Sequence, residues 1–224
     1  MGSVRHGVLS PDCAAAREKA KEVDFRYIHK IMVAPPGFRC VALLRGINVG
    51  GNNLIKMTAL KATFEGMGFE DVATYIQSGN VVFTAPGRGG ASAALKLAPT
   101  IEAALAAKFS YQASVVVRSE KDMRAIVARA PAGFGTEPAK YRYDVIYLKA
   151  PLAAAAAIKQ VPVKPGVDRA TVGPGVLYFS RLISQASASR LGKITALPLY
   201  ASVTIRNWNT TMALLRLLDG GEIR

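Results

Sequence analysis

Cysteine, histidine and acidic residues are all scarce in this sequence, and each shortage excludes a kind of chemistry. The 224 residues include only two cysteines, Cys13 and Cys40, which are too few for a disulfide framework or a zinc-binding cluster. Both histidines, His6 and His29, precede residue 39, so the rest of the chain cannot form a Ser-His-Asp or Cys-His catalytic group. We therefore expect neither a metal site nor a cofactor.

Long hydrophobic runs are also missing. No stretch approaches the roughly 20 apolar residues that a membrane-spanning helix needs. The N-terminus lacks the apolar core of a secretion signal. Cys40 lies in the short apolar run Cys40–Leu44 and is expected to be a small buried side chain. These features predict a cytoplasmic protein that does not enter a membrane.

Positive charge, in contrast, is abundant. Lys and Arg number 29 against 15 Asp and Glu, which gives a formal net charge of +14. Such an excess concentrates anions at the surface, so nucleic acid or a small phosphate-bearing ligand is the first partner to consider. The same excess can serve solubility alone, because net charge does not determine what a fold binds.

The chain divides at a run of helix- and strand-breaking residues, Ala34-Pro35-Pro36-Gly37. Residues 1–38 are predicted to form a flexible N-terminal extension. Met32 is the expected native start, which would make residues 1–31 dispensable. Beyond the extension we expect a first subdomain over 39–118, a helix and linker over 119–141, and a second subdomain over 142–224.

The periodicity of apolar residues predicts one order of elements twice: strand, helix, strand, strand, helix, strand. The first unit is predicted as strand 40–44, helix 57–67, strands 72–77 and 80–84, helix 91–108 and strand 112–118. The second is predicted as strand 142–148, helix 151–160, strands 168–172 and 175–179, helix 188–197 and strand 202–206, before a last helix over 209–218.

This order is typical of a split-βαβ fold. The predicted fold class is therefore α+β, with two ferredoxin-like (βαββαβ, α-β plait) subdomains in tandem plus a C-terminal helix. We expect the repeat to be one of topology and not of residues. Between the units, Ser119 and Asp122 have the spacing of a helix capping box.

A first polar cluster is predicted at one end of the first sheet. The first two strands of such a unit run in the same direction, so the loop after the first and the hairpin after the second emerge together. The backbone N–H groups of this Gly- and Asn-rich loop are suited to an oxyanion. Glycine and asparagine also make ordinary turns, and no GxGxxG or Walker pattern is present. The candidate ligand-binding residues are Arg45, Asn48, Gly50, Gly51, Gln77, Ser78 and Asn80.

A second polar cluster is predicted at the opposite end of the second sheet, where its third and fourth strands both end. Cations beside helix N-termini suit an anion, and a tryptophan there can stack on a base or sugar. The alternative is that an asparagine caps the last helix and the tryptophan packs in the core. The candidate residues are Ser189, Arg190, Lys193, Arg206, Asn207, Trp208 and Asn209.

Groups for proton transfer are few. Asp144 and Asp168 are the only carboxylates near a predicted sheet of the second unit, and we expect both on solvated edges. Lys193 and Ser189, four residues apart, could act as base and nucleophile, but a shared helix face explains their spacing more simply. No catalytic residue is therefore assigned.

Three motifs resemble a known family: LLRGINVGG at 43–51, TYIQSGNVVF at 74–83 and TIRNWNT at 204–210. They are similar to the bacterial domain-of-unknown-function family number 1697, and the similarity extends over about residues 39–218. The resemblance implies two plait-like subdomains and no established activity. The family usually has Ser-Lys-Leu before the last motif, where this chain has Ser189-Arg190-Leu191, so chemistry specific to lysine is not expected there.

Three functions stay open at this point. The expected one is a binding module for nucleic acid or another phosphate-bearing ligand. The second is an enzyme that acts on a small anionic substrate without metal or histidine. The third is a protein-interaction scaffold whose motifs are structural. The available side chains favour the first, because Arg, Lys, Asn, Gln and Ser hold an anion well and activate a nucleophile poorly.

Overall fold

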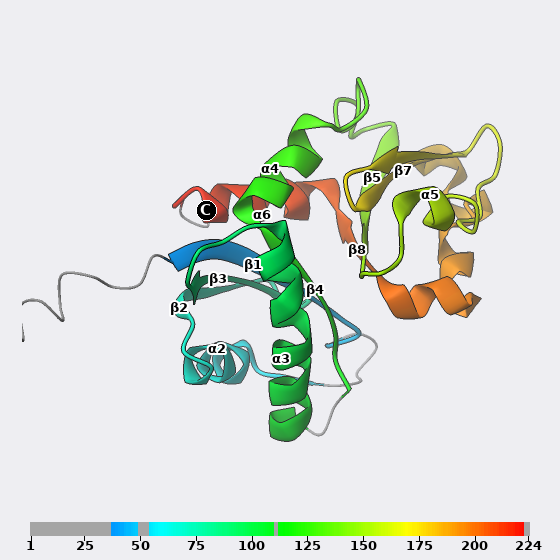
Figure 1. Cartoon of the computed structure of the whole chain (residues 1–224). Helices are drawn as coiled ribbons and strands as arrows, with labels where there is room; N and C mark the ends of the chain where they lie inside the picture. The colour runs from blue at the N-terminus through cyan, green and yellow to red at the C-terminus, as the bar shows by residue number, and fades with distance from the viewer. Residues whose placement is uncertain (1–36, 49–53, 110–111, 222–224) are drawn as a thin grey trace, which may run out of the picture. The chain divides into compact units, whose positions relative to one another are not determined.

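The structure is a computed structural model that describes residues 37–48, 54–109 and 112–221 (Figure 1). The predicted extension up to residue 36, including Met32, lies outside the described residues. Gly50 and Gly51 of the first polar cluster lie outside them as well. None of the helices in the described part of the chain combines the length and the hydrophobicity needed to cross a membrane.

Two four-stranded antiparallel sheets form the framework. The first has the order β2-β3-β1-β4, and the second has the equivalent order β6-β7-β5-β8. This arrangement confirms the predicted α+β fold with two ferredoxin-like units. The strands of the first sheet are β1 (Gly37–Arg45), β2 (Glu70–Tyr75), β3 (Asn80–Pro86) and β4 (Ser114–Ser119). Those of the second are β5 (Tyr141–Leu148), β6 (Asp168–Gly173), β7 (Val176–Leu182) and β8 (Val203–Asn207).

In the first unit, helices α2 (Met57–Gly66) and α3 (Ala91–Phe109) cover one face of the sheet (Figure 1). Strand alternation sends one set of apolar side chains towards these helices. Phe83 of β3 packs there with Phe64 of α2 and with Phe69, with ring centroids 4.6 to 6.0 Å apart. These contacts make the core of the first unit.

The second unit contains less helix than the sequence predicted. Helix α5 covers only Ala154–Ala157, and three short 3₁₀ helices, Ile183–Ala188, Leu191–Ala196 and Pro198–Ser202, replace the helix expected at 188–197. The predicted helices 151–160 and 188–197 are therefore wrong in length or type. Pro162 and Pro198 lie just beyond the two predicted helices and prevent their continuation, and Ser189 competes for backbone hydrogen bonds at the start of the second.

Helices α4 (Glu120–Ala128) and α6 (Trp208–Leu218) each follow the fourth strand of a unit and pack against each other (Figure 1). Ser119 caps α4 by accepting a hydrogen bond from the Asp122 N–H, and the reciprocal bond confirms the predicted capping box. Asn207 caps α6 by accepting from the Thr210 N–H at 2.7 Å.

One apolar cluster joins both units to these helices. It contains side chains from the remaining face of each sheet and from α4 and α6, and it is centred on fully buried residues. Its members include Val41, Leu43, Met123, Val145, Tyr147, Tyr178 and Leu214. The two units therefore share a core, in addition to the core that each has under its own helices or turns.

The two fourth strands resemble each other residue by residue. Residues 115–119 are VVVRS and residues 203–207 are VTIRN, so each strand has an arginine followed by the helix cap. Arg118 donates to carbonyl oxygens of the second unit, whereas Arg206 donates to carbonyl oxygens of the first. The expectation that the repeat involves topology alone is therefore wrong here, because residues recur where the units meet.

The two hairpins that receive these arginines are also equivalent. Gly79 follows β2 with a φ of 75°, and Gly175 follows β6 with a φ of 68°, a conformation that favours glycine. The Leu44 N–H donates to the Gly79 oxygen at 2.8 Å, and the Leu148 N–H donates to the Gly175 oxygen at 3.1 Å. Each unit thus presents the same turn to the arginine of the other.

Candidate ligand-binding site

Asn48 joins the two loops of the first polar cluster, which meet as the topology predicted. Its Nδ2 donates to the backbone oxygens of Ile55 and Gln77 at 3.0 and 2.9 Å. Its Oδ1 accepts from the Ile55 N–H at 2.7 Å. The side chain therefore holds the loop against the hairpin, while Gln77 itself is exposed.

Asn80 lies at the centre of this cluster and is fully buried. Its Nδ2 donates to the Tyr75 oxygen at 3.0 Å and to the Ser78 Oγ at 3.1 Å. Its Oδ1 accepts a hydrogen bond of 2.5 Å from the Nε of Arg206. The amide of Asn80 is thus engaged on every side within the protein.

Arg206 belongs to this first cluster in space, although it comes from β8 of the second unit. Its Nη2 donates to the carbonyl oxygens of Leu44, Ser78 and Gly79 at 2.7, 2.9 and 3.3 Å, and its Nη1 donates to Thr204 Oγ1 and the Ile205 oxygen at 2.9 and 2.8 Å. Together with the bond to Asn80, every N–H of the guanidinium has an acceptor. Burial lowers the pKa of Arg206 to about 10. The contacts indicate a structural role.

Arg45 lies at the end of β1 and contacts the second unit through an aromatic ring. Its guanidinium carbon is 5.1 Å from the centroid of the Tyr200 ring, within the range of a cation–π interaction. Arg45 and Arg206 therefore both extend across the boundary between the units.

The three residues Ser189, Arg190 and Lys193 lie among the 3₁₀ helices of the second unit. The Arg190 backbone N–H donates to Asp168 Oδ2 at 2.8 Å, and the Ser189 Oγ accepts from the Leu191 N–H at 3.3 Å. Among the described residues, none of the three hydrogen-bonds to Arg206, which the sequence had grouped with them. Lys193 is exposed and does not share an α-helix with Ser189.

The expectation that Asp144 and Asp168 lie on solvated edges is wrong. Their exposed fractions are 8% and 9%. Asp168 Oδ2 accepts hydrogen bonds from the backbone N–H groups of Lys164 and Arg190, at 3.0 and 2.8 Å. Asp144 Oδ2 lies 3.4 Å from Arg181 Nη2, and burial still raises the pKa of Asp144.

Trp208 is half-buried at the start of α6. Its ring lies edge-on to the ring of Phe134, with centroids 5.2 Å apart and planes at 87°. Together with Asn207 and Asn209, Trp208 lines a pocket of about 250 Å³ that also borders Tyr141 and Arg142. The C-terminal motif thus forms part of a surface hollow, with Asn207 as helix cap.

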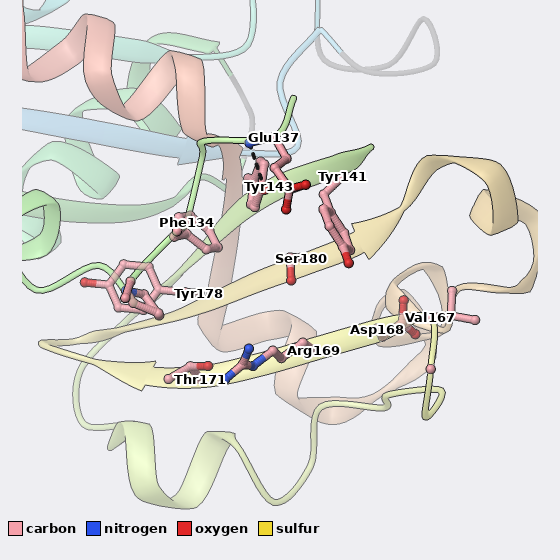
Figure 2. Close-up of a pocket in the computed structure, with 14 residues that line it drawn as sticks. Phe134, Glu137, Tyr141, Tyr143, Val167, Asp168, Arg169, Thr171, Tyr178 and Ser180 are labelled. Carbon is pink, nitrogen blue, oxygen red and sulfur yellow. Dashed lines mark hydrogen bonds between the residues drawn. The ribbon is translucent and has the colours of Figure 1, made fainter. Parts of the chain in front are cut away.

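A larger cavity of about 440 Å³ lies on the other side of Tyr141, over the second sheet (Figure 2). The linker after α4 forms one wall, and strands β5, β6 and β7 form the floor. Phe134 of the linker packs edge-on against Tyr143 and Tyr178, with centroids 4.9 and 5.3 Å away. The labelled lining residues in Figure 2 are Phe134, Glu137, Tyr141, Tyr143, Val167, Asp168, Arg169, Thr171, Tyr178 and Ser180.

Strand register explains why these side chains converge. Arg169 pairs with Ser180 and Thr171 pairs with Tyr178, so the four residues share one face of β6 and β7. Alternation places Tyr141 on the same face of β5. The Tyr178 hydroxyl donates to the Ile126 oxygen at 2.6 Å, and burial raises the pKa of Tyr178 to about 12. The floor is therefore rigid and aromatic at one end and hydroxyl-bearing at the other.

The rim around Tyr141 is positively charged. Lys140, Arg142 and Arg169 are exposed there, against the one exposed carboxylate of Glu137. The Lys140 Nζ lies 5.2 Å from the centroid of the Tyr141 ring. Asp168, which also borders the cavity, directs one oxygen to two backbone N–H groups. The cavity lining itself contains one cation, Arg169, and two carboxylates, Glu137 and Asp168, and the Oδ1 of Asp168 is buried without a partner. The positive excess around Tyr141 comes from Lys140 and Arg142, which lie beside the cavity.

Residues 38–178, more than half of the chain, match one protein family. The matching family is described as a protein of unknown function (DUF1697). The chain belongs to this family. The resemblance that three motifs predicted is therefore confirmed.

Comparison with solved structures supports the fold of this family member. No curated protein matches the sequence. Five chains of solved structures match. One is a conserved bacterial protein from Streptococcus pneumoniae, 24% identical with a TM-score of 0.69, and the match covers 82% of this chain and 99% of that one. At that identity the likeness shows the shared fold and no more.

Sequence reasoning missed Tyr141 and Arg169, which lie at the centre and rim of the hollow. The pattern Tyr141-Arg142-Tyr143 alternates an aromatic with a cation at the start of a strand, and this alternation was the available signal. This alternation predicts that Tyr141 and Tyr143 share a face of the strand. It does not predict that the linker after α4, about thirty residues before β6 in the sequence, forms the wall of a cavity over them. The wall depends on tertiary contact.

Proposed function

We propose that this protein binds a ligand that combines a planar base with phosphate, at the hollow around Tyr141. The observation that carries the proposal is the cavity of about 440 Å³ with an aromatic wall, lined by Arg169 and lying beside the exposed cations Lys140 and Arg142. Its volume lies in the range of small-ligand sites, roughly 300–1,000 Å³. The proposal keeps the expected ligand class and moves the site away from the two clusters that the sequence predicted.

Stacking is the first part of the argument. Tyr141 is half-buried and borders both the larger cavity and the pocket beside Trp208, so bases on either side can contact it. Stacking of a base on an aromatic side chain contributes roughly 1–3 kcal/mol and tolerates any base. Thr171 and Ser180 supply hydroxyl groups on the floor, where a base edge or a sugar would lie.

Charge is the second part. Arg142 follows Tyr141 on β5, and Arg169 lies on β6, which β7 separates from β5; both arginines are exposed. Guanidinium groups at these two places suit the phosphates of a ligand that stacks on Tyr141. The net charge of +14 would raise the local concentration of such an anionic ligand.

The test is fluorescence anisotropy with a labelled single-stranded oligonucleotide of about eight residues, at several salt concentrations, with a mononucleotide as competitor. Tyr141→Ala should weaken binding by about 1–3 kcal/mol, because it removes the stacking surface. Tyr141→Phe should bind as the native protein does. Arg169→Ala should weaken binding for every sequence and lower the salt slope by about one.

Arg88→Ala is the matched control, because Arg88 is an exposed arginine of the first unit, outside both hollows. It should leave affinity unchanged at fixed salt. If Arg88→Ala and Arg169→Ala lose the same affinity, the charge acts only as a general attraction and the proposed site is wrong. Competition by the mononucleotide would indicate a nucleotide ligand, and its failure beside tight oligonucleotide binding would indicate nucleic acid.

The cytoplasmic location belongs to the same proposal. The free thiol of Cys40 is buried, and burial raises its pKa to about 12, which is compatible with a reducing compartment.

A further inference from the structure

Arg118 and Arg206 are equivalent residues of the two units, but only one of them has a complete set of acceptors. Arg118 Nη2 donates to the oxygens of Leu148 and Gly175 at 2.6 and 2.9 Å, and its Nη1 donates to the Val117 oxygen at 2.9 Å. These bonds match those of Arg206 to Leu44, Gly79 and Ile205.

The remaining bonds of Arg206 have no counterpart at Arg118. Asn80 and Thr204 supply side-chain oxygens to Arg206, whereas valine stands at the equivalent positions, 176 and 116. The Nε of Arg118 and one N–H of its Nη1 therefore have no acceptor among the described residues. Arg118 is only 6% exposed, and burial lowers its pKa. Among the described residues, the buried polar atoms that lack a partner do not include its Nε, so this donor reaches solvent, where a ligand oxygen can take the place of water.

A cavity of about 340 Å³ lies beside this guanidinium. Apart from Arg118 and Asp122, apolar groups and prolines form its wall. They are Ala91, Leu95, Leu148, Ala150, Pro151, Leu152 and Pro174, with Gly175. Leu95, which is 42% exposed, places apolar surface at the opening.

Asp122 defines the other polar point of the cavity. Its Oδ2 accepts from the N–H and the Oγ of Ser119, at 3.0 and 2.7 Å. Its Oδ1 accepts no hydrogen bond from the described residues. The cavity thus contains the guanidinium of Arg118, which can donate further hydrogen bonds, and the Oδ1 of Asp122, which can accept them. The rest of its wall is apolar.

We infer that this cavity binds a small molecule with a carboxylate on a short, branched apolar body. The carboxylate would accept hydrogen bonds from Arg118, as Asn80 and Thr204 do at Arg206. The apolar body would lie against Leu95, Leu148 and Leu152. A ligand with an ammonium group beside its carboxylate would also pair with Asp122. This site is separate from the hollow around Tyr141.

The test is isothermal titration calorimetry on the full chain with two probes, L-leucine and 4-methylpentanoate, which differ by the ammonium group. We expect saturable binding of both, with leucine the tighter because Asp122 would repel a bare anion. Isoamyl alcohol, which lacks the carboxylate, should not bind. If neither carboxylate binds at about 10 mM, a concentration well above typical Kd values for such ligands, the inference is overturned.

Two variants address the site without removing Arg118, whose loss can unfold the protein. Ala91→Phe places a ring at the wall and should weaken binding at least about tenfold, equal to about 1.4 kcal/mol. Ala107→Phe makes the same change at an exposed position near the other end of α3 and should have no effect. Val116→Thr gives Arg118 the hydroxyl that Thr204 gives Arg206, and should also weaken binding. Equal affinity in Ala91→Phe and Ala107→Phe would place the ligand elsewhere and contradict the inference.

Discussion

The two halves of this molecule contact each other through the same residues and differ in how completely those contacts are satisfied. At the Arg206 contact, Asn80 and Thr204 complete a hydrogen-bond set that leaves no donor over. At the Arg118 contact, valines at 116 and 176 supply no such acceptor, and a cavity borders the arginine. The same arginine-to-hairpin contact is therefore a fully hydrogen-bonded structural contact at Arg206 and borders a candidate binding site at Arg118.

The largest expected effect on stability comes from replacing each of the two arginines in turn. Arg206→Ala should lower the free energy of unfolding by about 3 kcal/mol or more, because it leaves Asn80 Oδ1 and the carbonyl oxygens of Leu44 and Ser78 buried without donors. Arg118→Ala should cost less, since fewer acceptors depend on it. Urea unfolding at pH 7 measures both, and equal losses would contradict the asymmetry.

A smaller effect on stability is expected when single side chains are exchanged between the Arg206 and Arg118 contacts. Thr204→Val removes one acceptor from Arg206 and should cost about 1–2 kcal/mol in the free energy of unfolding. Val116→Thr makes the mirror change at Arg118 and should be close to neutral, because its hydroxyl gains a partner. Thermal unfolding of the two variants and of the double variant would show this. A destabilising Val116→Thr of the same size would mean that valine packing, and not the unmet donor, decides position 116.

The smallest effect concerns Tyr147, which stands in the second unit where the first has Leu43. Burial raises the pKa of Tyr147 to about 12, although Thr211, Arg206 and Arg118 lower it. Because the folded pKa lies above the unfolded value of 10.0, this tyrosine stabilises the fold below pH 10 and loses that contribution as the pH rises towards 12. Tyr147→Phe should cost only about 1 kcal/mol at pH 7, from the lost 3.0 Å bond to Thr211 Oγ1.

Absorbance near 295 nm during an alkaline titration follows this ionisation. The native protein should show a late step near pH 12, and Tyr147→Phe should reduce its amplitude. Tyr178, whose pKa is also raised to about 12, should account for the rest. An unchanged late step in Tyr147→Phe would show that Tyr147 ionises with the exposed tyrosines.

Local sequence patterns were enough to predict the fold. Strand alternation, the Ser78-Gly79 turn and the Ser119 cap depend on neighbours in the chain, and each is found in the structure. The helices expected at 151–160 and 188–197 were wrong because apolar spacing does not distinguish a full α-helix from a single helical turn or a short 3₁₀ helix.

The candidate site was harder to predict, because side-chain direction across a unit boundary is not a local property. Topology placed Arg206 at the correct end of its strand, but its guanidinium points into the first unit. The burial of Asp144 and Asp168 depends on elements far away in the sequence. The repeat of VVVRS and VTIRN was visible in the sequence and marked both arginines.

The exchange of arginines between the halves has the form of an isologous interface, in which each of two partners offers the other the same residues. Two identical subunits that met in this way could not change one copy of the contact without changing the other. Here both copies lie in one polypeptide, so each can be altered separately. Position 80 has asparagine and position 176 has valine, an inequality that a symmetric dimer of identical chains cannot contain.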